Sequence, residues 1–157
     1  MKDEERVLKI LGDMRDNEEL LYAVYGKFAA IFPEQHDFWH EISIEENSHA
    51  LMVDTFISLY KDKYMLFQDR PLAREDVQEE IGNIKRFLKR LNEGSKISLS
   101  SALEFALKTE NAMVEKEIFK YDESYPEDFK KMARILTPDS KRRVRKIESL
   151  YESIRNA

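Results

Sequence analysis

The sequence predicts an all-α protein, and three observations support this fold class. The 157 residues include only four Gly and four Pro, which leaves few turn signals for a fold of many short strands. Charged residues make up 36% of the chain and hydrophobic residues 42%, a balance that suits amphipathic helices. Apolar residues also recur at steps of three, four or seven along most of the chain, which is the spacing of a buried helix face.

The first half of the chain predicts two long helices that pair as a hairpin. The first covers residues 3–31, and Pro33, which is acceptable in the first turn of a helix, opens a second helix that ends near residue 64. The apolar stripes of these helices are Val7, Leu11, Met14, Leu21, Tyr25, Phe28 and Phe32, followed by Trp39, Ile42, Val53, Phe56 and Tyr60.

A crossover segment follows, with a short helix of its own. The helical spacing is lost over residues 66–71 and returns from Val77 to Leu91. The run Asn92-Glu93-Gly94 is then a helix-stop signal, because Gly readily adopts the left-handed conformation that ends many helices.

The last third of the chain predicts a second hairpin. Ser98 or Ser100 caps a helix that stops near Tyr125-Pro126, and a fourth helix starts at Pro126. The run Thr137-Pro138-Asp139-Ser140 predicts a break in this helix, because it reads as a new N-cap followed by Pro. Two hairpins joined by a crossover predict a four-helix bundle, and residues 1–157 form a single domain because no linker is long enough to divide them.

Composition excludes several classes of function. The net charge of −5 gives no overall attraction to nucleic acid or to an anionic membrane, and no apolar run approaches the roughly 18 residues of a membrane span. The absence of cysteine excludes disulfides and thiolate metal sites. Because the first six residues lack the apolar core of a signal peptide, we expect a cytoplasmic protein.

Three of the predicted helices carry charged residues where the stripe requires an apolar side chain. A buried carboxylate costs several kcal/mol unless it is paired, protonated or bound to a cation. Glu46 and His49 are three residues apart on one helix face, so both can reach the same metal ion. The charged positions are Glu18 in the first helix, Glu46 and His49 in the second, and Glu110 in the third.

Several of these segments resemble rubrerythrin-like proteins of the ferritin-like superfamily. Glu18 with Tyr22 and Tyr25, then Phe38-Trp39 and residues 45–50, resemble their first hairpin, and residues 97–110 resemble the opening of their third helix. The resemblance implies a ferritin-like four-helix bundle with a di-iron or di-manganese carboxylate centre. Such centres oxidise iron, reduce peroxide or activate dioxygen.

The resemblance also implies a ligand set. Glu18 and His49 match the terminal ligands of one metal, Glu46 matches a bridging carboxylate, and Glu110 matches the terminal carboxylate of the second metal. It further implies no haem, and rubredoxin-type iron is excluded because the chain has no cysteine.

The fourth helix departs from the family pattern of a second Glu-x-x-His. Glu46 lies thirteen residues after Pro33, and the same count from Pro126 reaches Asp139. Arg142 then stands where His49 stands in the first half, and no His follows His49. We therefore expect a degenerate site that holds one or at most two iron or manganese ions through Glu18, Glu46, His49 and Glu110, aided by Asp139.

Two functions stay open on the sequence alone. The first is a metal-binding protein, and if it is an enzyme, a non-haem iron or manganese oxidoreductase acting on a small-molecule oxidant. The second is a metal-free helical bundle in which Arg142 neutralises Glu110 or Glu46 and which acts as a structural or interaction protein. In either case we expect a homodimer that binds neither nucleic acid nor a membrane.

Other residues near the predicted site receive simpler roles. Two further acids, Glu45 and Glu117, are substitute ligands at most. The other two histidines, His36 and His40, differ from Glu46 in helical phase, and this difference favours surface or helix-start roles for them. Tyr22, Tyr25 and Trp39 lie on core stripes, where aromatic residues usually serve packing. The basic run 141–146 is spread around a helix, and such runs usually form a solvated face.

Overall fold

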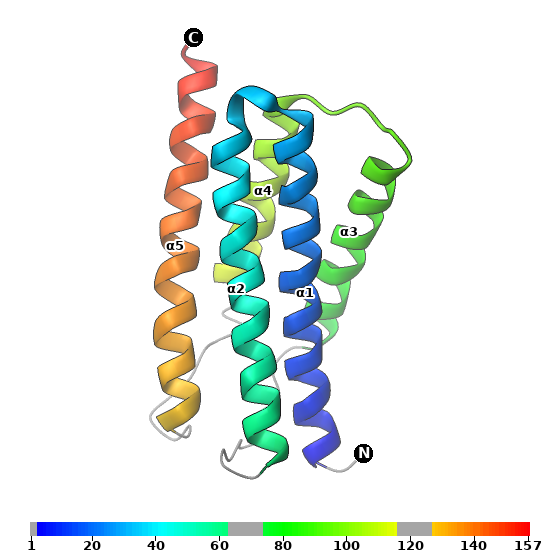
Figure 1. Cartoon of the computed structure of the whole chain (residues 1–157), viewed down its shortest axis with the longest axis vertical. Helices are drawn as coiled ribbons and strands as arrows, with labels where there is room; N and C mark the ends of the chain where they lie inside the picture. The colour runs from blue at the N-terminus through cyan, green and yellow to red at the C-terminus, as the bar shows by residue number, and fades with distance from the viewer. Residues whose placement is uncertain (1–2, 63–73, 116–126) are drawn as a thin grey trace. The chain divides into compact units, whose positions relative to one another are not determined.

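The computed structural model describes residues 3–62, 74–115 and 127–157 (Figure 1). These residues contain no strand, which confirms the predicted all-α fold class. Among them, no helix combines the length and the apolar character that a membrane span requires. The elements are α1 (Asp3–Ile31), the 3₁₀ helix η1 (Pro33–Gln35), α2 (His36–Lys61), α3 (Arg74–Asn92), α4 (Leu99–Glu115) and α5 (Glu127–Arg155).

The chain forms two compact units, Met1–Ser95 and Lys96–Ala157. In the first unit, α1 packs against α2 as the predicted hairpin, and α3 also packs against α1 (Figure 1). The apolar stripes predicted from the sequence supply most of its core. The buried apolar residues of this unit are Leu11, Met14, Leu21, Val24, Tyr25, Phe28, Ala29, Trp39, Ile42, Ala50, Val53, Ile81, Ile84 and Leu91.

Aromatic rings form the core at the closed end of the hairpin. Trp39 of α2 stacks on Tyr25 of α1 with ring centroids 5.8 Å apart and meets Phe28 edge-on at 4.8 Å. Phe87 of α3 meets Phe28 edge-on at 6.0 Å. Tyr25 and Trp39 are fully buried, which confirms their predicted packing role, whereas Tyr22 is 44% exposed and lies outside the core.

The turn between α1 and α2 differs slightly from the prediction. Pro33 does not begin the α-helix itself but opens η1, and α2 begins at His36. The Gln35 N–H donates to the Phe32 carbonyl at 3.0 Å, three residues back, which is the hydrogen bond of a 3₁₀ turn. Proline suits this position because it has no N–H to donate and the first N–H groups of a helix have no internal partner.

The end of α3 confirms the predicted stop signal. Gly94 has a φ of +85°, a conformation that costs glycine little because it has no Cβ. The Gly94 N–H donates to the Leu91 carbonyl at 3.1 Å, and the Ser95 N–H donates to the Arg90 carbonyl at 3.0 Å. These two bonds are those of a Schellman motif, which satisfies carbonyl groups at the end of the helix.

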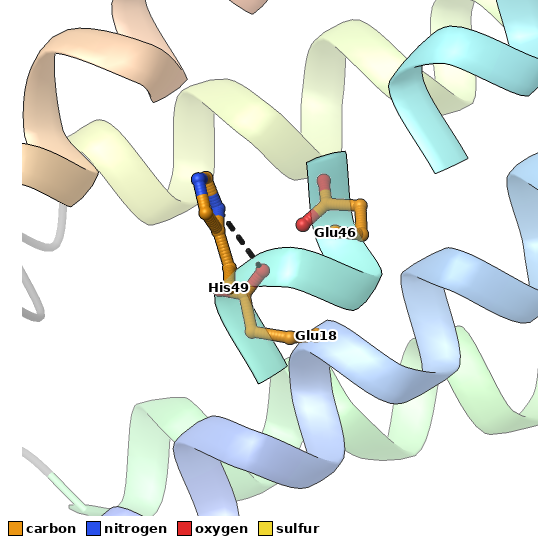
Figure 2. A group of neighbouring side chains, drawn as sticks. All are labelled: Glu18, Glu46 and His49. Carbon is orange, nitrogen blue, oxygen red and sulfur yellow. Dashed lines mark ion pairs between the residues drawn. The ribbon is translucent and has the colours of Figure 1, made fainter. Parts of the chain in front are cut away.

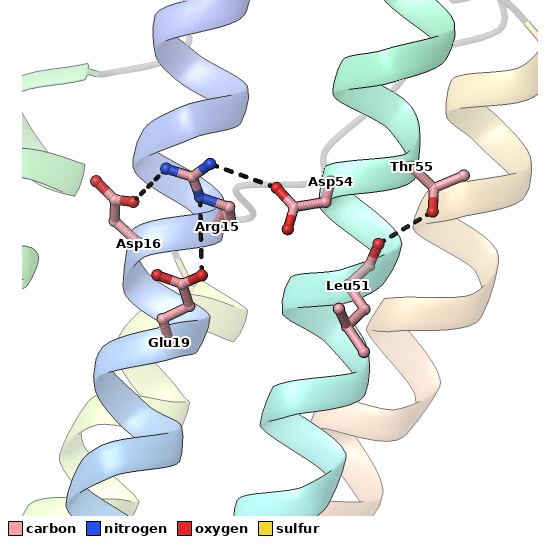
Figure 3. Close-up of polar contacts among 6 residues, drawn as sticks. All are labelled: Arg15, Asp16, Glu19, Leu51, Asp54 and Thr55. Carbon is pink, nitrogen blue, oxygen red and sulfur yellow. Dashed lines mark hydrogen bonds and ion pairs between the residues drawn. The ribbon is translucent and has the colours of Figure 1, made fainter.

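Polar contacts on the surface of the first unit connect α1 to α2 (Figure 3). Arg15 donates to Asp54 at 3.4 Å across the helices and to Asp16 at 3.0 Å, and its Nε lies 4.0 Å from a Glu19 oxygen. All four side chains are more than one-third exposed, so solvent weakens these ion pairs. The network orients the hairpin but contributes at most about 1 kcal/mol per pair.

Asp13 is a buried acid on α1. Its carboxyl group accepts a hydrogen bond from Gln78 of α3, and the side chain is only 9% exposed. Burial raises the pKa of Asp13 above its ordinary value of 3.8, because removal from water disfavours the charged carboxylate. The folded state therefore binds the Asp13 proton more tightly than the unfolded state does.

We expect Asp13→Asn to raise the free energy of unfolding at pH 7. An acid whose pKa is raised by folding contributes its full stabilisation below pH 3.8, the pKa of the unfolded state. This contribution is lost as the pH rises through the pKa of the folded state. The neutral amide avoids that loss and keeps a hydrogen-bonding group for Gln78. Urea unfolding from pH 7 to pH 4 measures the effect, and the advantage of the variant should shrink as the pH falls. The exposed acid Glu34 provides the control, Glu34→Gln, and an equal gain in that control would contradict the prediction.

The second unit pairs α4 with α5. Among the side chains described in this unit, the buried apolar ones are Ala102, Leu103, Ala106, Val144 and Ile147. Ser98 caps α4 as predicted, because the Ser101 N–H donates to the Ser98 hydroxyl at 3.1 Å. Near the C-terminal end, the Tyr151 hydroxyl donates to the Glu104 carboxylate at 2.8 Å.

The predicted break at Pro138 is wrong, because α5 is helical without interruption from Glu127 to Arg155. An internal proline removes one backbone hydrogen bond, but its fixed φ of about −65° is that of an α-helix, so the turns on either side can continue the helix. The predicted loss of helical spacing at residues 66–71 and the predicted end of the third helix near Tyr125 lie outside the described residues.

Candidate metal centre

Three polar side chains meet inside the α1–α2 hairpin (Figure 2). Glu18 comes from α1, and Glu46 and His49 come from α2. Each offers one possible ligand atom, and these atoms all lie within 4.8 Å of one another. Nδ1 of His49 lies 3.6 Å from Oε2 of Glu18. All three side chains are buried, Glu46 completely.

The local sequence explains this convergence. Glu46 and His49 are three residues apart, so they lie on one face of α2, between the buried Ile42 and Val53. Glu18 occupies a position on the inward stripe of α1, where its neighbours along the stripe are apolar and buried. Pairing the two helices by their apolar faces therefore brings the three polar side chains together.

The buried position makes this arrangement costly without compensation. A carboxylate moved from water into a protein interior loses hydration worth several kcal/mol, and the group contains two carboxylates beside one imidazole. A protonated His49 would offset one of the negative charges through its contact with Glu18. A divalent cation would offset both.

The donor set and its spacing fit a transition-metal ion. Carboxylate oxygen and imidazole nitrogen are ligands suited to iron, manganese and zinc. With metal–ligand bonds of about 2.0–2.2 Å, two ligand atoms of one ion lie at most about 4.0–4.4 Å apart. The separation of 3.6 Å already falls within this limit, and the 4.8 Å bound on the others requires only a small closure of the side chains.

Glu110, the fourth predicted ligand, lies on α4 in the second unit and has a cation as its neighbour. The Nη1 atom of Arg143, on α5, donates to Oε2 of Glu110 at 3.3 Å, and both side chains are fully buried. The sequence had suggested Arg142 as the residue that neutralises a buried carboxylate. In the structure Arg142 is exposed, and Arg143 is the buried arginine beside Glu110.

Counting equal distances from Pro33 and Pro126 points to Arg142 but takes no account of which face of α5 is buried. One residue rotates a side chain by about 100° around a helix, so Arg142 and Arg143 lie on different faces. The apolar stripe of α5 carried the better signal, since Arg143 lies four residues before the buried Ile147.

The remaining candidates lie elsewhere or cannot be placed. Asp139 is on α5, but its side chain is outside the described part of the structure, as is Glu117 altogether. Glu45 is half-buried and does not belong to the group of three. His36 and His40 are exposed at the start of α2, where the sequence had placed them. In the basic run, Lys141, Arg142 and Arg145 are exposed.

Fold and site together define a class: an all-helical protein with a buried carboxylate–histidine group in its first hairpin. Comparison of the chain with family models, with curated proteins and with solved structures found no match. The likeness to rubrerythrin-like proteins therefore rests on the sequence motifs.

Proposed function

We propose that this protein binds a divalent transition-metal ion, iron or manganese, through Glu18, Glu46 and His49, in a ferritin-like helical protein. The observation that carries the proposal is the convergence of two carboxylates and one imidazole, from two helices, within 4.8 Å in a buried position. The motif likeness to rubrerythrin-like proteins supports the choice of iron or manganese. Glu110 and Asp139 stay predicted ligands.

The three residues would have distinct tasks. Glu18 and Glu46 supply negative charge and hard oxygen donors, and His49 supplies a nitrogen donor that is selective for transition metals over calcium or magnesium. Three protein ligands leave coordination positions for a small molecule, and bound iron or manganese would supply redox chemistry there. The buried position keeps bulk water away from such a reaction.

One observation favours a second candidate function. Glu110 is paired with a buried arginine within its own unit, so a cationic side chain can compensate a buried carboxylate in this protein. The contact between His49 and Glu18 at 3.6 Å would offset one of the two carboxylate charges of the buried group in a similar way. The alternative is thus a metal-free helical protein that acts as a structural or interaction protein.

Metal binding has a direct readout in Trp39, the only tryptophan of the chain. Trp39 is buried on α2, seven residues before Glu46 and thus about 10 Å along the helix axis. We expect Mn²⁺ added to metal-free protein to quench Trp39 fluorescence and saturate at one ion per chain. Glu18→Gln removes one charged ligand and should weaken the apparent affinity by at least about tenfold.

Glu19→Gln is the matched control, because Glu19 is the next residue on α1 and its side chain is 57% exposed. It should leave the titration unchanged. Elemental analysis of protein purified without chelator completes the test. The proposal fails if iron, manganese and zinc are all absent at stoichiometric level and reconstitution produces no uptake.

A further inference from the structure

Two histidines stand one helical turn apart at the start of α2, outside the buried group. His36 and His40 are separated by four residues, the spacing that places side chains on the same helix face. Their rings stack nearly in parallel, with centroids 5.4 Å apart and an angle of 16° between the ring planes. Both residues are exposed, so their side chains can adjust to a ligand at little cost.

A carboxylate already orients one of these rings. Nδ1 of His36 lies 3.0 Å from Oδ1 of Asp37. A carboxylate can only accept, so the proton of this hydrogen bond is on Nδ1, and in the neutral ring Nε2 is left with a lone pair. Metal-binding histidines typically have this arrangement, in which a carboxylate holds one nitrogen and the other nitrogen binds the metal.

The charge around the pair also favours a cation. The positive end of a helix dipole lies at the start of α2 and opposes cation binding there. Glu34 and Asp37 lie within two residues of His36 and are both exposed. No Lys or Arg occurs between Lys27 and Lys61, so no basic residue lies near the pair in the sequence. Two full negative charges outweigh the partial charge of one helix end.

We propose that His36 and His40 form a second, surface metal site that chelates one Ni²⁺, Cu²⁺ or Zn²⁺ ion, with Asp37 orienting His36. Imidazole nitrogen suits these ions, whereas Mn²⁺ binds such ligands more weakly. The site is separate from the buried group, because His40 and His49 are nine residues apart, about 13 Å along the helix axis. The proposal therefore stands whether or not the buried group holds a metal.

The chain offers a simple background for the test. It has three histidines, so in His49→Gln the only ones left are His36 and His40. Titration calorimetry of this variant with Ni²⁺ at pH 7.5 should show one ion per chain. Adding His40→Gln should weaken binding by at least about tenfold, because the two linked ligands then no longer act on one ion. Adding Asp37→Asn should weaken it by about tenfold through loss of the orienting contact.

A spacing control separates chelation from general histidine content. Exchanging two neighbours, Gln35→His together with His36→Gln, keeps the composition and charge but changes the histidine separation from four residues to five. The exchanged protein should bind Ni²⁺ as weakly as the His40→Gln variant. Equal affinity before and after the exchange, or no Ni²⁺ binding by the parent variant, overturns the proposal.

A second measurement covers the case in which His49→Gln does not fold. In the wild-type chain with ¹⁵N-labelled histidine, substoichiometric Ni²⁺ should broaden the ring signals of His36 and His40 before those of His49. Broadening of the His49 signals first, or of none, would overturn the surface site.

Discussion

Arg143→Met is expected to lower the free energy of unfolding by about 3–5 kcal/mol, because it leaves the Glu110 carboxylate buried without its cation. Both side chains are fully buried, and their contact measures 3.3 Å. The apolar Met fills much of the space of the arginine stem, so loss of packing accounts for little of the change. Urea unfolding monitored by circular dichroism measures the difference.

Two further variants test whether the unpaired charge of Glu110 causes this loss of stability. Glu110→Leu combined with Arg143→Met removes both charges and should recover most of the lost stability, since buried ion pairs replaced by apolar residues are often neutral or stabilising. Arg142→Met changes the exposed neighbour and should alter stability by no more than about 0.5 kcal/mol. A larger effect at Arg142 than at Arg143 would contradict the structural assignment.

Glu46→Leu is expected to abolish the effect of metal on stability. A ligand that binds only the folded state stabilises a protein by about 2.7 kcal/mol when its free concentration is one hundred times its dissociation constant. Wild-type protein should gain this amount with Mn²⁺, and the variant should gain none because it lacks the fully buried carboxylate of the group.

The same variant discriminates between the two proposed functions. Thermal unfolding with and without Mn²⁺ should differ in wild type only. If Mn²⁺ shifts neither protein, the group is a polar relic and the metal-free alternative holds. Glu41→Leu is the control, because Glu41 is exposed on the same helix and its replacement should leave the metal response intact.

Much of the secondary structure was readable from the sequence because its causes are local. The apolar stripes predicted the buried faces of α1, α2 and α3, and Gly94 and Ser98 marked the end of α3 and the start of α4. Such signals act within one or two turns of chain. Pro138 does not interrupt α5, since a proline weakens a helix locally without determining whether the helix continues.

The candidate site was readable only in part. The spacing of Glu46 and His49 places both on one face of α2 from sequence alone. The 3.6 Å contact of His49 with Glu18 could be found only from the pairing of the two helices, because it joins residues that are distant in the chain. The helical period predicts that Glu18 faces inward, but it does not predict which side chain Glu18 contacts.

Sequence by itself determined that this protein is helical, where most of its helices lie and which polar residues interrupt their buried faces. Tertiary structure decided that Glu18 meets His49, that Asp13 is buried beside Gln78, and that Arg143 is the arginine that holds Glu110. The physical reason is angular: one residue rotates a side chain by about 100° around a helix. Neighbours such as Arg142 and Arg143 therefore face different surroundings, and only packing determines which of them is buried.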